Sequence, residues 1–428
     1  MREIKKTPKI IVYFAPQQIT GEKVRLTMPR RTISLYHRIE RALETIAAGS
    51  TPLQTIQQTA GFLATSFSDD LGLIGGRIYH LDEEAYELVA TFGGAGATIL
   101  GQRVDPDYAP IRRLFETGTL VMHRDDPELD PGLESLLGTR EVFATAIVDG
   151  GNFILSFDID AHEDNREDLV STLNIVRLAI NQQLREERMA AVMEDARQIQ
   201  TSILPRHMEA PGQFVVAARS LPAEVVGGDF YDLIPMDETA FSVVVADATG
   251  HGLPAALQVR DVFTGLRMGL SREYKLGRTL ERLNGIIHGS RMATKFVSLF
   301  LAEIDLDGTM IHCSAGHPPA LLIRASGEIE RLAIGGLPLG PFPNARYTAG
   351  LDHFHEGDTL VVYSDGITEA HGTGEIEFGM DRLETLVVGS RHLDPEALVE
   401  KIFDEVSDFS GGEQAHDDQT VLVVQWRS

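Results

Sequence analysis

Four acidic sites in the second half of the chain stand in the same kind of local sequence. Asp229 and Asp247 lie eighteen residues apart, each at the edge of a short apolar run and close to glycine. Asp365 and the adjacent pair Asp417 and Asp418 repeat this setting further along the chain. Carboxylates at strand ends, where glycine lets the backbone approach closely, suit hard divalent cations bound through oxygen. The pattern therefore indicates a two-metal hydrolytic site.

A single aspartate in such a position is more often a turn or helix-cap residue, so only the recurrence at four sites favours metal ligands. Asp232, three residues after Asp229, is expected to cap or support its neighbour rather than bind an ion. His317, which precedes two prolines, is expected to be structural.

The overall composition limits the class of protein. The chain has 428 residues with 43% hydrophobic and 24% charged residues, which is typical of a globular protein of two domains with connectors. A formal net charge of −25 argues against non-specific nucleic-acid binding. The lone Cys313 excludes an internal disulfide and indicates a reducing, cytoplasmic setting. No apolar run is long enough to span a membrane.

The first half of the chain predicts a layer of helices against an antiparallel sheet, an α+β arrangement. Residues 1–33 form an extension to which we assign no function, and residues 34–165 form one domain. Its predicted helices and strands follow the apolar periodicity of the sequence. The helices are 34–48, 53–67 and 110–116, and the strands are 73–81, 86–92, 118–122, 142–148 and 152–159.

This domain resembles a GAF domain, a cytosolic sensor of small ligands or signals. The resemblance is carried by the segments 87–93 and 118–122 and by Asp125-Asp126-Pro127. A PAS-like domain is the main alternative. No cysteine is present here to bind a bilin or an iron–sulfur cluster. The sequence does not identify the ligand of this sensor.

A long helix is predicted next, because residues 161–204 contain neither glycine nor proline. Leu169, Leu173, Val176 and Ile180 repeat at heptad spacing, and a looser apolar stripe continues to Ile203. Residues 166–206 are thus a helical, coiled-coil-like linker. Two interpretations remain open: the helix packs against its own domains, or it pairs in a parallel homodimer that transmits a signal.

Residues 207–428 form the second domain. Strands are predicted at 213–220, 241–246, 296–304, 310–315, 320–324, 360–363 and 420–425, and helices at 253–270 and 279–290. Two helices between groups of strands favour an αββα sandwich.

Eight motifs in this domain, in order, resemble the bacterial SpoIIE/RsbU type of metal-dependent protein phosphatase, within the PPM family. The segment 196–205 also resembles the helical entry to such domains. The motifs are Gly227–Asp232, Asp247–Gly252, Phe296–Phe300, Ala315–Pro319, Leu337–Gly340, Gly357–Leu360, Tyr363–Ala370 and Asp417–Thr420.

The resemblance implies an αββα fold, two Mn²⁺ or Mg²⁺ ions, and hydrolysis of phosphoserine or phosphothreonine in a protein. The implied substrate is a STAS-domain anti-anti-sigma factor in a partner-switching pathway. Asp229 and Asp247 would bridge the metals, and the backbone carbonyl of Ala248 would be a further ligand. Asp365 and Asp417 would complete the set, with Asp418 as the alternative to Asp417.

The remaining roles are less well defined by the resemblance. His251, in a Gly-His-Gly turn, would act as a general acid, bind an outer water or serve local structure. Eukaryotic relatives place a phosphate-binding arginine just before the first metal carboxylates, where this chain has no arginine in residues 221–225. Arg219 and Lys295 are the candidates for that function.

We therefore expect a cytoplasmic Ser/Thr phosphatase that a GAF-like sensor gates through the helical linker. Two alternatives belong to other classes: a non-catalytic module whose phosphatase fold docks a partner, and a hydrolase of a small phosphoester. The particular phosphoprotein, the activating signal and the metal used in the cell are not given by the sequence.

Overall fold

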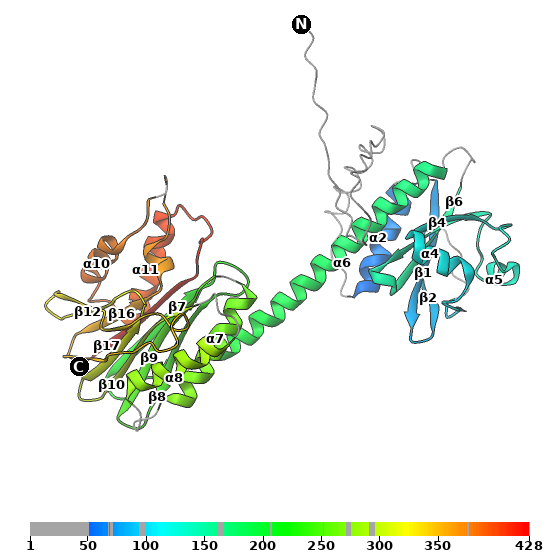
Figure 1. Ribbon diagram of the computed structural model, residues 1–428. Helices are drawn as coiled ribbons and strands as arrows, with labels where there is room; N and C mark the ends of the chain where they lie inside the picture. Colours follow the sequence, from blue (N-terminus) through cyan, green and yellow to red (C-terminus); the bar gives the residue numbers. More distant parts are fainter. Residues whose placement is uncertain are drawn as a thin grey trace, which may run out of the picture. The chain divides into compact units, whose positions relative to one another are not determined.

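The computed structural model describes residues 51–427 except 67, 69–71, 94–99, 161–165, 206–207, 251, 271–274, 291–295, 373 and 375. The extension 1–33 and the helix predicted at 34–48 lie outside the described residues. The chain divides into two compact units, with the boundary after Arg188. One helix, α6 (Arg166–Ile203), contributes residues to both units (Figure 1).

The first unit is built on a six-stranded antiparallel sheet; the sequence predicts an antiparallel sheet but only five of these strands, without residues 103–104. The strands lie in the order β3-β2-β1-β6-β5-β4. The first and the last strand in the sequence, β1 and β6, therefore pair with each other in the middle of the sheet. The strands are β1 (Leu73–Asp82), β2 (Ala85–Gly93), β3 (Arg103–Val104), β4 (Thr119–His123), β5 (Val142–Val148) and β6 (Phe153–Ile159).

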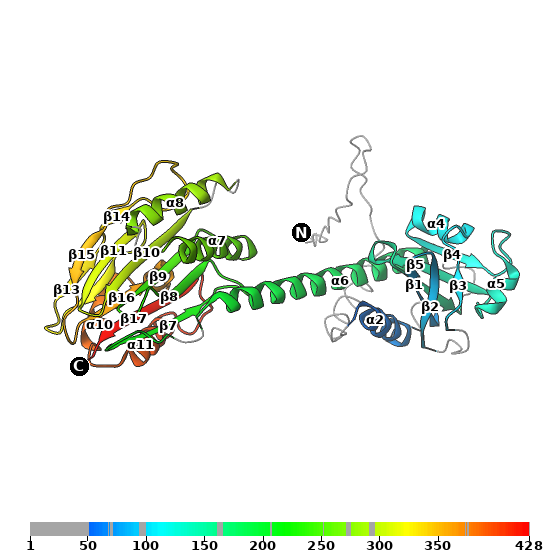
Figure 2. The same ribbon diagram turned by 90° about the horizontal axis from the view of Figure 1, so that it is seen from below.

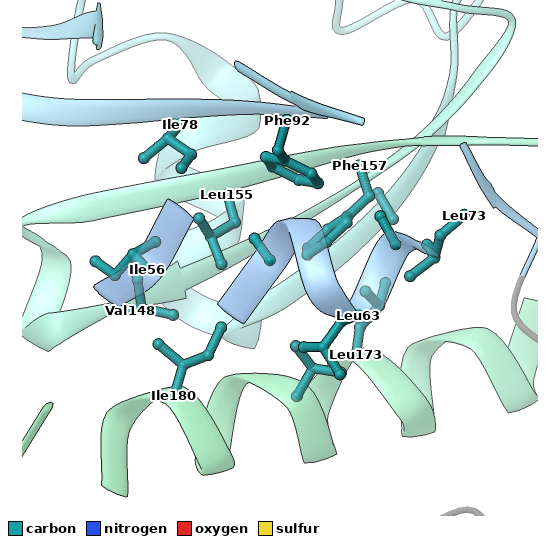
Figure 3. Packing of buried hydrophobic residues seen from close by; sticks show 14 of the residues in the cluster. Ile56, Leu63, Leu73, Ile78, Phe92, Val148, Leu155, Phe157, Leu173 and Ile180 are labelled. Carbon is teal, nitrogen blue, oxygen red and sulfur yellow. The ribbon is translucent and has the colours of Figure 1, made fainter. Parts of the chain in front are cut away.

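Helices cover both faces of this sheet. On one face, α2 (Pro52–Ser66) and the first half of α6 pack against strand residues such as Leu155 and Phe157 (Figure 3). On the other face lie α4 (Ala109–Thr117) and α5 (Pro131–Leu136). Figure 2 shows α2 and α4 on opposite sides of the strands. Each face therefore has an apolar core of its own.

The heptad seam of α6 belongs to the first of these cores. Leu173 and Val176 are fully buried, and Leu169, Ile180 and Leu184 are nearly so, all in the cluster that contains α2. This matches the interpretation in which the helix packs against its own domain. These side chains are not available to a partner helix.

The second unit contains two stacked sheets with a shared apolar interior. One has the order β14-β11-β10-β9-β8 with β15 added at β11, and the other has the order β13-β12-β16-β17-β7. The strands are β7 (Phe214–Leu221), β8 (Asp229–Pro235), β9 (Ala240–Ala248), β10 (Val297–Asp305), β11 (Thr309–Ala315), β12 (Ala320–Ile323), β13 (Ile329–Leu332), β14 (Gly335–Gly336), β15 (Gly350–His353), β16 (Thr359–Tyr363) and β17 (Gln419–Trp426).

Two pairs of helices enclose the sheets and complete the αββα sandwich. Helices α7 (Leu253–Gly269) and α8 (Leu276–Gly289) cover the first sheet. Helices α10 (Met380–Gly389) and α11 (Pro395–Phe409) cover the second, and the sequence analysis did not predict them (Figure 1). The helices thus lie outside the two sheets. No helix in the described part of the chain has the length and apolarity needed to cross a membrane.

Candidate active site

Antiparallel pairing of β8 and β9 brings the first two predicted carboxylates together. Asp229 is the first residue of β8, and its register partner on β9 is Asp247. Asp229 is only 3% exposed, whereas Asp247 is partly exposed. The sequence separation of these residues follows from the hairpin that joins the two strands.

The carboxylate of Asp229 has no hydrogen bond of ordinary geometry to either oxygen in the described structure, and both oxygens are buried. The hydroxyls of Thr420 and Ser364 are close enough to lower its pKa in part. The hydroxyls of Ser364 and Thr420 lie nearby, but they donate to the Asp418 carbonyl and to Ser220 Oγ. Burial, and then the charge of Asp247, raise the pKa of Asp229 well above its ordinary value. Burying a carboxylate without a partner costs free energy, so a cation bound at Asp229 would stabilise this position.

The second sheet supplies the other two carboxylates. Ser364 N donates to the Thr420 carbonyl, and Thr420 N donates to Ser364 Oγ at 2.9 Å, so the end of β16 is tied to the start of β17. Asp365 follows as the first residue of the short helix α9 (Asp365–Thr368). Burial, and then Asp417, raise the pKa of Asp365.

The charges of carboxylates from one sheet raise the pKa of a carboxylate on the other sheet. The pKa of Asp247 rises to about 8, first through burial and then through the charges of Asp365 and Asp417. Like charges in a partly buried site disfavour ionisation unless a cation is present. The charges that act on Asp247 thus come from α9 and from the segment before β17.

Asp417 and Asp418 have different surroundings. Asp418 is 2% exposed and accepts hydrogen bonds from the backbone N–H of Ala223, at 2.7 Å, and of Gly228. Asp417 is exposed, and one of its oxygens accepts only from the Asp418 N–H at 2.8 Å. Asp418 therefore fixes the loop before Asp229, while Asp417 keeps acceptor oxygens free.

Three glycines are needed because the backbone passes too close for a side chain. A Cβ on Gly227 would lie 2.6 Å from an Asp418 carboxylate oxygen, and one on Gly228 would lie 2.5 Å from the Ala248 carbonyl oxygen. A Cβ on Gly366 would collide with the Asp418 carbonyl. The glycines beside the carboxylates thus allow the strand ends to meet.

Sequence analysis missed one residue that contacts this region, Gln200 on α6. Its Nε2 donates to the Gly227 carbonyl at 2.7 Å, and its Oε1 accepts from the Gly227 N–H at 3.1 Å. Gly227 is two residues before Asp229. A glutamine in a charged helix carries no signal of such a contact; only the resemblance of residues 196–205 to a family segment pointed to this stretch.

The donor set suits divalent cations, although the described residues contain no ready-made group of three or more Asp, Glu, His or Cys side chains around one point. The unpaired oxygens of Asp229 are the observation that fits a metal. The carbonyl of Ala248 approaches Gly228 at the same strand ends. All these donors are oxygens, which Mg²⁺ and Mn²⁺ prefer.

The other predicted residues lie as follows. Arg219 donates to Glu400 at 2.5 Å and stacks on Phe403, and both of these residues belong to α11. Arg219 therefore does not lie beside the carboxylates. Asp232 is fully buried and forms a two-point ion pair with Arg267. His251 and Lys295 lie outside the described residues.

A cavity of about 190 Å³ is lined by Asp417 and also by Glu369, His371, Glu413 and His416. The rings of His371 and His416 meet edge to face, with centroids 5.7 Å apart. The cavity therefore reaches the candidate site at Asp417.

Comparison with known proteins gives the family of the segment that contains Asp247, Asp365 and Asp417. The family model for Stage II sporulation protein E (SpoIIE) matches residues 237–427. Residues 237–427 form a SpoIIE-family PP2C-type phosphatase domain. The chain is 26% identical to the phosphoserine phosphatase RsbU of Bacillus subtilis over 245 residues, a match that covers 56% of this chain and 71% of RsbU.

Two further proteins resemble parts of this chain. Protein IcfG of Synechocystis sp. is 26% identical over 307 residues, or 63% of this chain and 48% of IcfG, so the match spans about half of that relative. The SiaA-PP2C domain of Pseudomonas aeruginosa shares the fold, with a TM-score of 0.50 and 19% identity over 56% of this chain and 98% of that domain. The phosphatase domain is a serine phosphatase domain of the PPM/SpoIIE family, homologous to RsbU.

Proposed function

We propose that this protein is a metal-dependent phosphatase that hydrolyses phosphoserine or phosphothreonine in another protein. The observation that carries the proposal is the buried Asp229, which faces Asp247 and has both oxygens without a hydrogen bond. Two divalent cations, Mn²⁺ or Mg²⁺, would be held by Asp229, Asp247, the Ala248 carbonyl, Asp365 and Asp417. Phosphatases of the PPM family are metal-dependent, which supports this assignment.

The chemistry divides between the ions and the protein. When bound, such ions supply an activated water as nucleophile and neutralise charge on the phosphoryl oxygens. The protein holds the carboxylates at rigid strand ends, so their orientation is set before substrate arrives. Asp418 contributes by positioning the Gly228 backbone rather than by binding an ion. His251 would act as a general acid or hold an outer water.

The substrate we propose is a phosphorylated anti-anti-sigma factor of the STAS type in a partner-switching pathway. The similarity to the phosphoserine phosphatase RsbU supports it. The cavity beside Asp417 is open to a side chain that projects from a protein surface. A small phosphoester is the competing substrate class, and direct comparison of turnover separates the two.

The first unit is proposed to act as a GAF-like sensor, consistent with its antiparallel sheet and two helical faces. Its signal would reach the phosphatase domain through α6, which is a single helix from Arg166 to Ile203. The last turns of that helix hold Gly227 through Gln200. A homodimer formed through the same helix is part of this proposal.

The test is turnover of an aryl phosphate by the full-length protein with and without Mn²⁺. We expect turnover that depends on Mn²⁺ and falls by about a hundredfold or more in Asp365→Asn, because a metal ligand is lost. Asp381→Asn, the same change at an exposed position of α10, is the control and should keep full activity. Absence of turnover, or equal turnover in Asp365→Asn, would favour a docking module instead.

A further inference from the structure

A second cavity lies in the first unit, which contains none of the residues assigned to the phosphatase reaction. Its volume is about 60 Å³, and it is bounded by β-strand side chains and by α4 and α5. One water-sized group needs roughly 10–15 Å³, so the cavity has room for about four to six such groups. It can therefore hold a small organic molecule.

Aromatic and aliphatic side chains make up most of the wall. Tyr79, Tyr86, Tyr108 and Phe143 all line the cavity, together with aliphatic residues from the same face of the sheet. Tyr86 is anchored, because its hydroxyl donates to the Gly151 carbonyl at 2.6 Å. Aromatic faces attract cations, and the attraction grows when water is excluded.

One carboxylate, Glu134, is part of this apolar lining. It is 4% exposed, and it accepts hydrogen bonds from the Tyr108 hydroxyl at 3.0 Å and from Thr139 Oγ1 at 2.6 Å. No cation pairs with it among the described residues. The buried guanidinium of Arg77 is engaged by Asp158 and by the Leu137 carbonyl. A buried carboxylate without a cationic partner is unusual and costly.

A second polar group at the cavity is the Tyr79 hydroxyl. Tyr79 is 7% exposed and lines the cavity. Burial raises the pKa of this hydroxyl; Arg77 lowers it, and Glu134 raises it again. The charge of Glu134 is thus felt across the cavity. Glu134, which has no cationic partner among the described residues, and the Tyr79 hydroxyl border the same small space, and this arrangement favours a cationic ligand.

We propose that this cavity binds a small organic ammonium ion. The ammonium group would pair with Glu134 and lie against the tyrosine rings, and the hydrocarbon part would fill the space between the aliphatic side chains. A neutral molecule of the same shape would leave the carboxylate without a cation. The ligand of the first unit would then belong to a defined chemical class, the small organic ammonium ions.

The competing explanation is that Glu134 only ties α5 to α4, since it accepts from Tyr108 just before α4 and from Thr139 just after α5. A purely structural carboxylate would show no preference for a charged ligand. Its loss would lower stability without changing the binding of any amine.

The experiment measures binding of isobutylammonium to the full-length protein by ligand-detected saturation-transfer NMR, with isobutanol as the neutral molecule of matched shape. We expect saturable binding of the amine with a Kd of about a millimolar. Isobutanol should bind at least about tenfold more weakly. Glu134→Gln, which keeps an acceptor oxygen but removes the charge, should weaken amine binding by at least about tenfold.

Glu128→Gln is the matched control, because Glu128 is an exposed carboxylate in the same region that pairs with Arg113. It should bind the amine as the wild type does. If Glu134→Gln unfolds, Ser156→Leu tests the same idea by filling the cavity while the carboxylate stays. No saturable amine binding, equal binding of isobutanol, or unchanged amine binding in a folded variant would overturn the proposal. Since the readout is binding alone, these outcomes leave the proposed phosphatase activity untouched.

Discussion

At the scale of single residues, two aspartates show how burial and hydrogen bonding separate structural from functional carboxylates. Asp229 and Asp418 are 3% and 2% exposed. Asp418 accepts two backbone N–H groups, whereas Asp229 accepts none. A carboxylate with two N–H donors is satisfied by the protein itself, and one without such donors is stabilised by a cation, as we propose for Asp229. Equal burial is thus compatible with different roles.

His317 leads to a prediction on pH and stability. It is buried, its Nδ1 faces Ser298 Oγ at 2.8 Å, and its Nε2 has no hydrogen bond. Burial lowers its pKa from 6.5 to about 3, and the backbone of Tyr363 offsets only part of that fall. Below about pH 6.5 the unfolded chain binds a proton that the folded chain cannot, so stability falls as the pH drops toward 3.

The slope for one such group is about 1.4 kcal/mol per pH unit within that range. Urea unfolding at about pH 7.5 and about pH 5.5 should therefore show a smaller loss of unfolding free energy in His317→Gln than in the wild type, by about 1–2 kcal/mol. His392→Gln, at an exposed histidine, should follow the wild type. Parallel pH dependence of His317→Gln and wild type would contradict the prediction.

Residue types alone led to the candidate carboxylates, whereas the different surroundings of Asp417 and Asp418 could not be predicted. Both residues have the same side chain and the same apolar strand after them. What distinguishes them is the backbone of Ala223 and Gly228, nearly 200 residues earlier in the chain. Sequence spacing cannot show which of two neighbours meets a distant N–H group.

At the scale of elements, the sequence predicted the strands with strong apolar runs and missed the helices α10 and α11. A start signal for α11 was present, since Asp394 accepts from the Ala397 N–H and Pro395 is the first helical residue. The heptad seam of α6 was read correctly as an apolar stripe. Its partner, however, is the sheet and α2 of the same unit, and periodicity alone cannot name the partner.

The last turns of α6 give a prediction about the metal site. Gln200→Ala removes both hydrogen bonds to Gly227 and frees the backbone that leads to Asp229. Loss of such an outer contact weakens metal binding by roughly tenfold or more. We expect the Mn²⁺ concentration for half-maximal turnover to rise by about that factor, with most of the maximal rate recovered at saturation.

Gln198→Ala is the control for this change, because Gln198 is exposed and donates only to Glu194 within the helix. Its metal dependence should equal that of the wild type. If Gln200→Ala lowered the maximal rate without changing the Mn²⁺ requirement, the contact would act on another step. If neither quantity changed, α6 would have no part in positioning Gly227.

At the scale of the whole molecule, a homodimer would form through apolar side chains of α6 that are exposed in the single chain. Val192 is 50% exposed and Ile199 is 53% exposed. They are seven residues apart, so they lie on the same side of the helix. Since the seam before Leu184 is buried in the first unit, this later part of α6 is the segment left for pairing with a second copy.

We therefore predict that Ile199→Glu shifts the full-length protein from dimer to monomer in sedimentation equilibrium, because a charge at a paired apolar position must be desolvated without a partner. The expected change is an increase of about tenfold or more in the dimer dissociation constant. Leu351→Glu introduces the same charge at a side chain that is 72% exposed on β15 and should leave the oligomeric state unchanged. A dimer that persists in Ile199→Glu would assign the interface to another surface. A wild-type monomer would remove dimerisation through the helix from the regulatory proposal while leaving the carboxylate site as it stands.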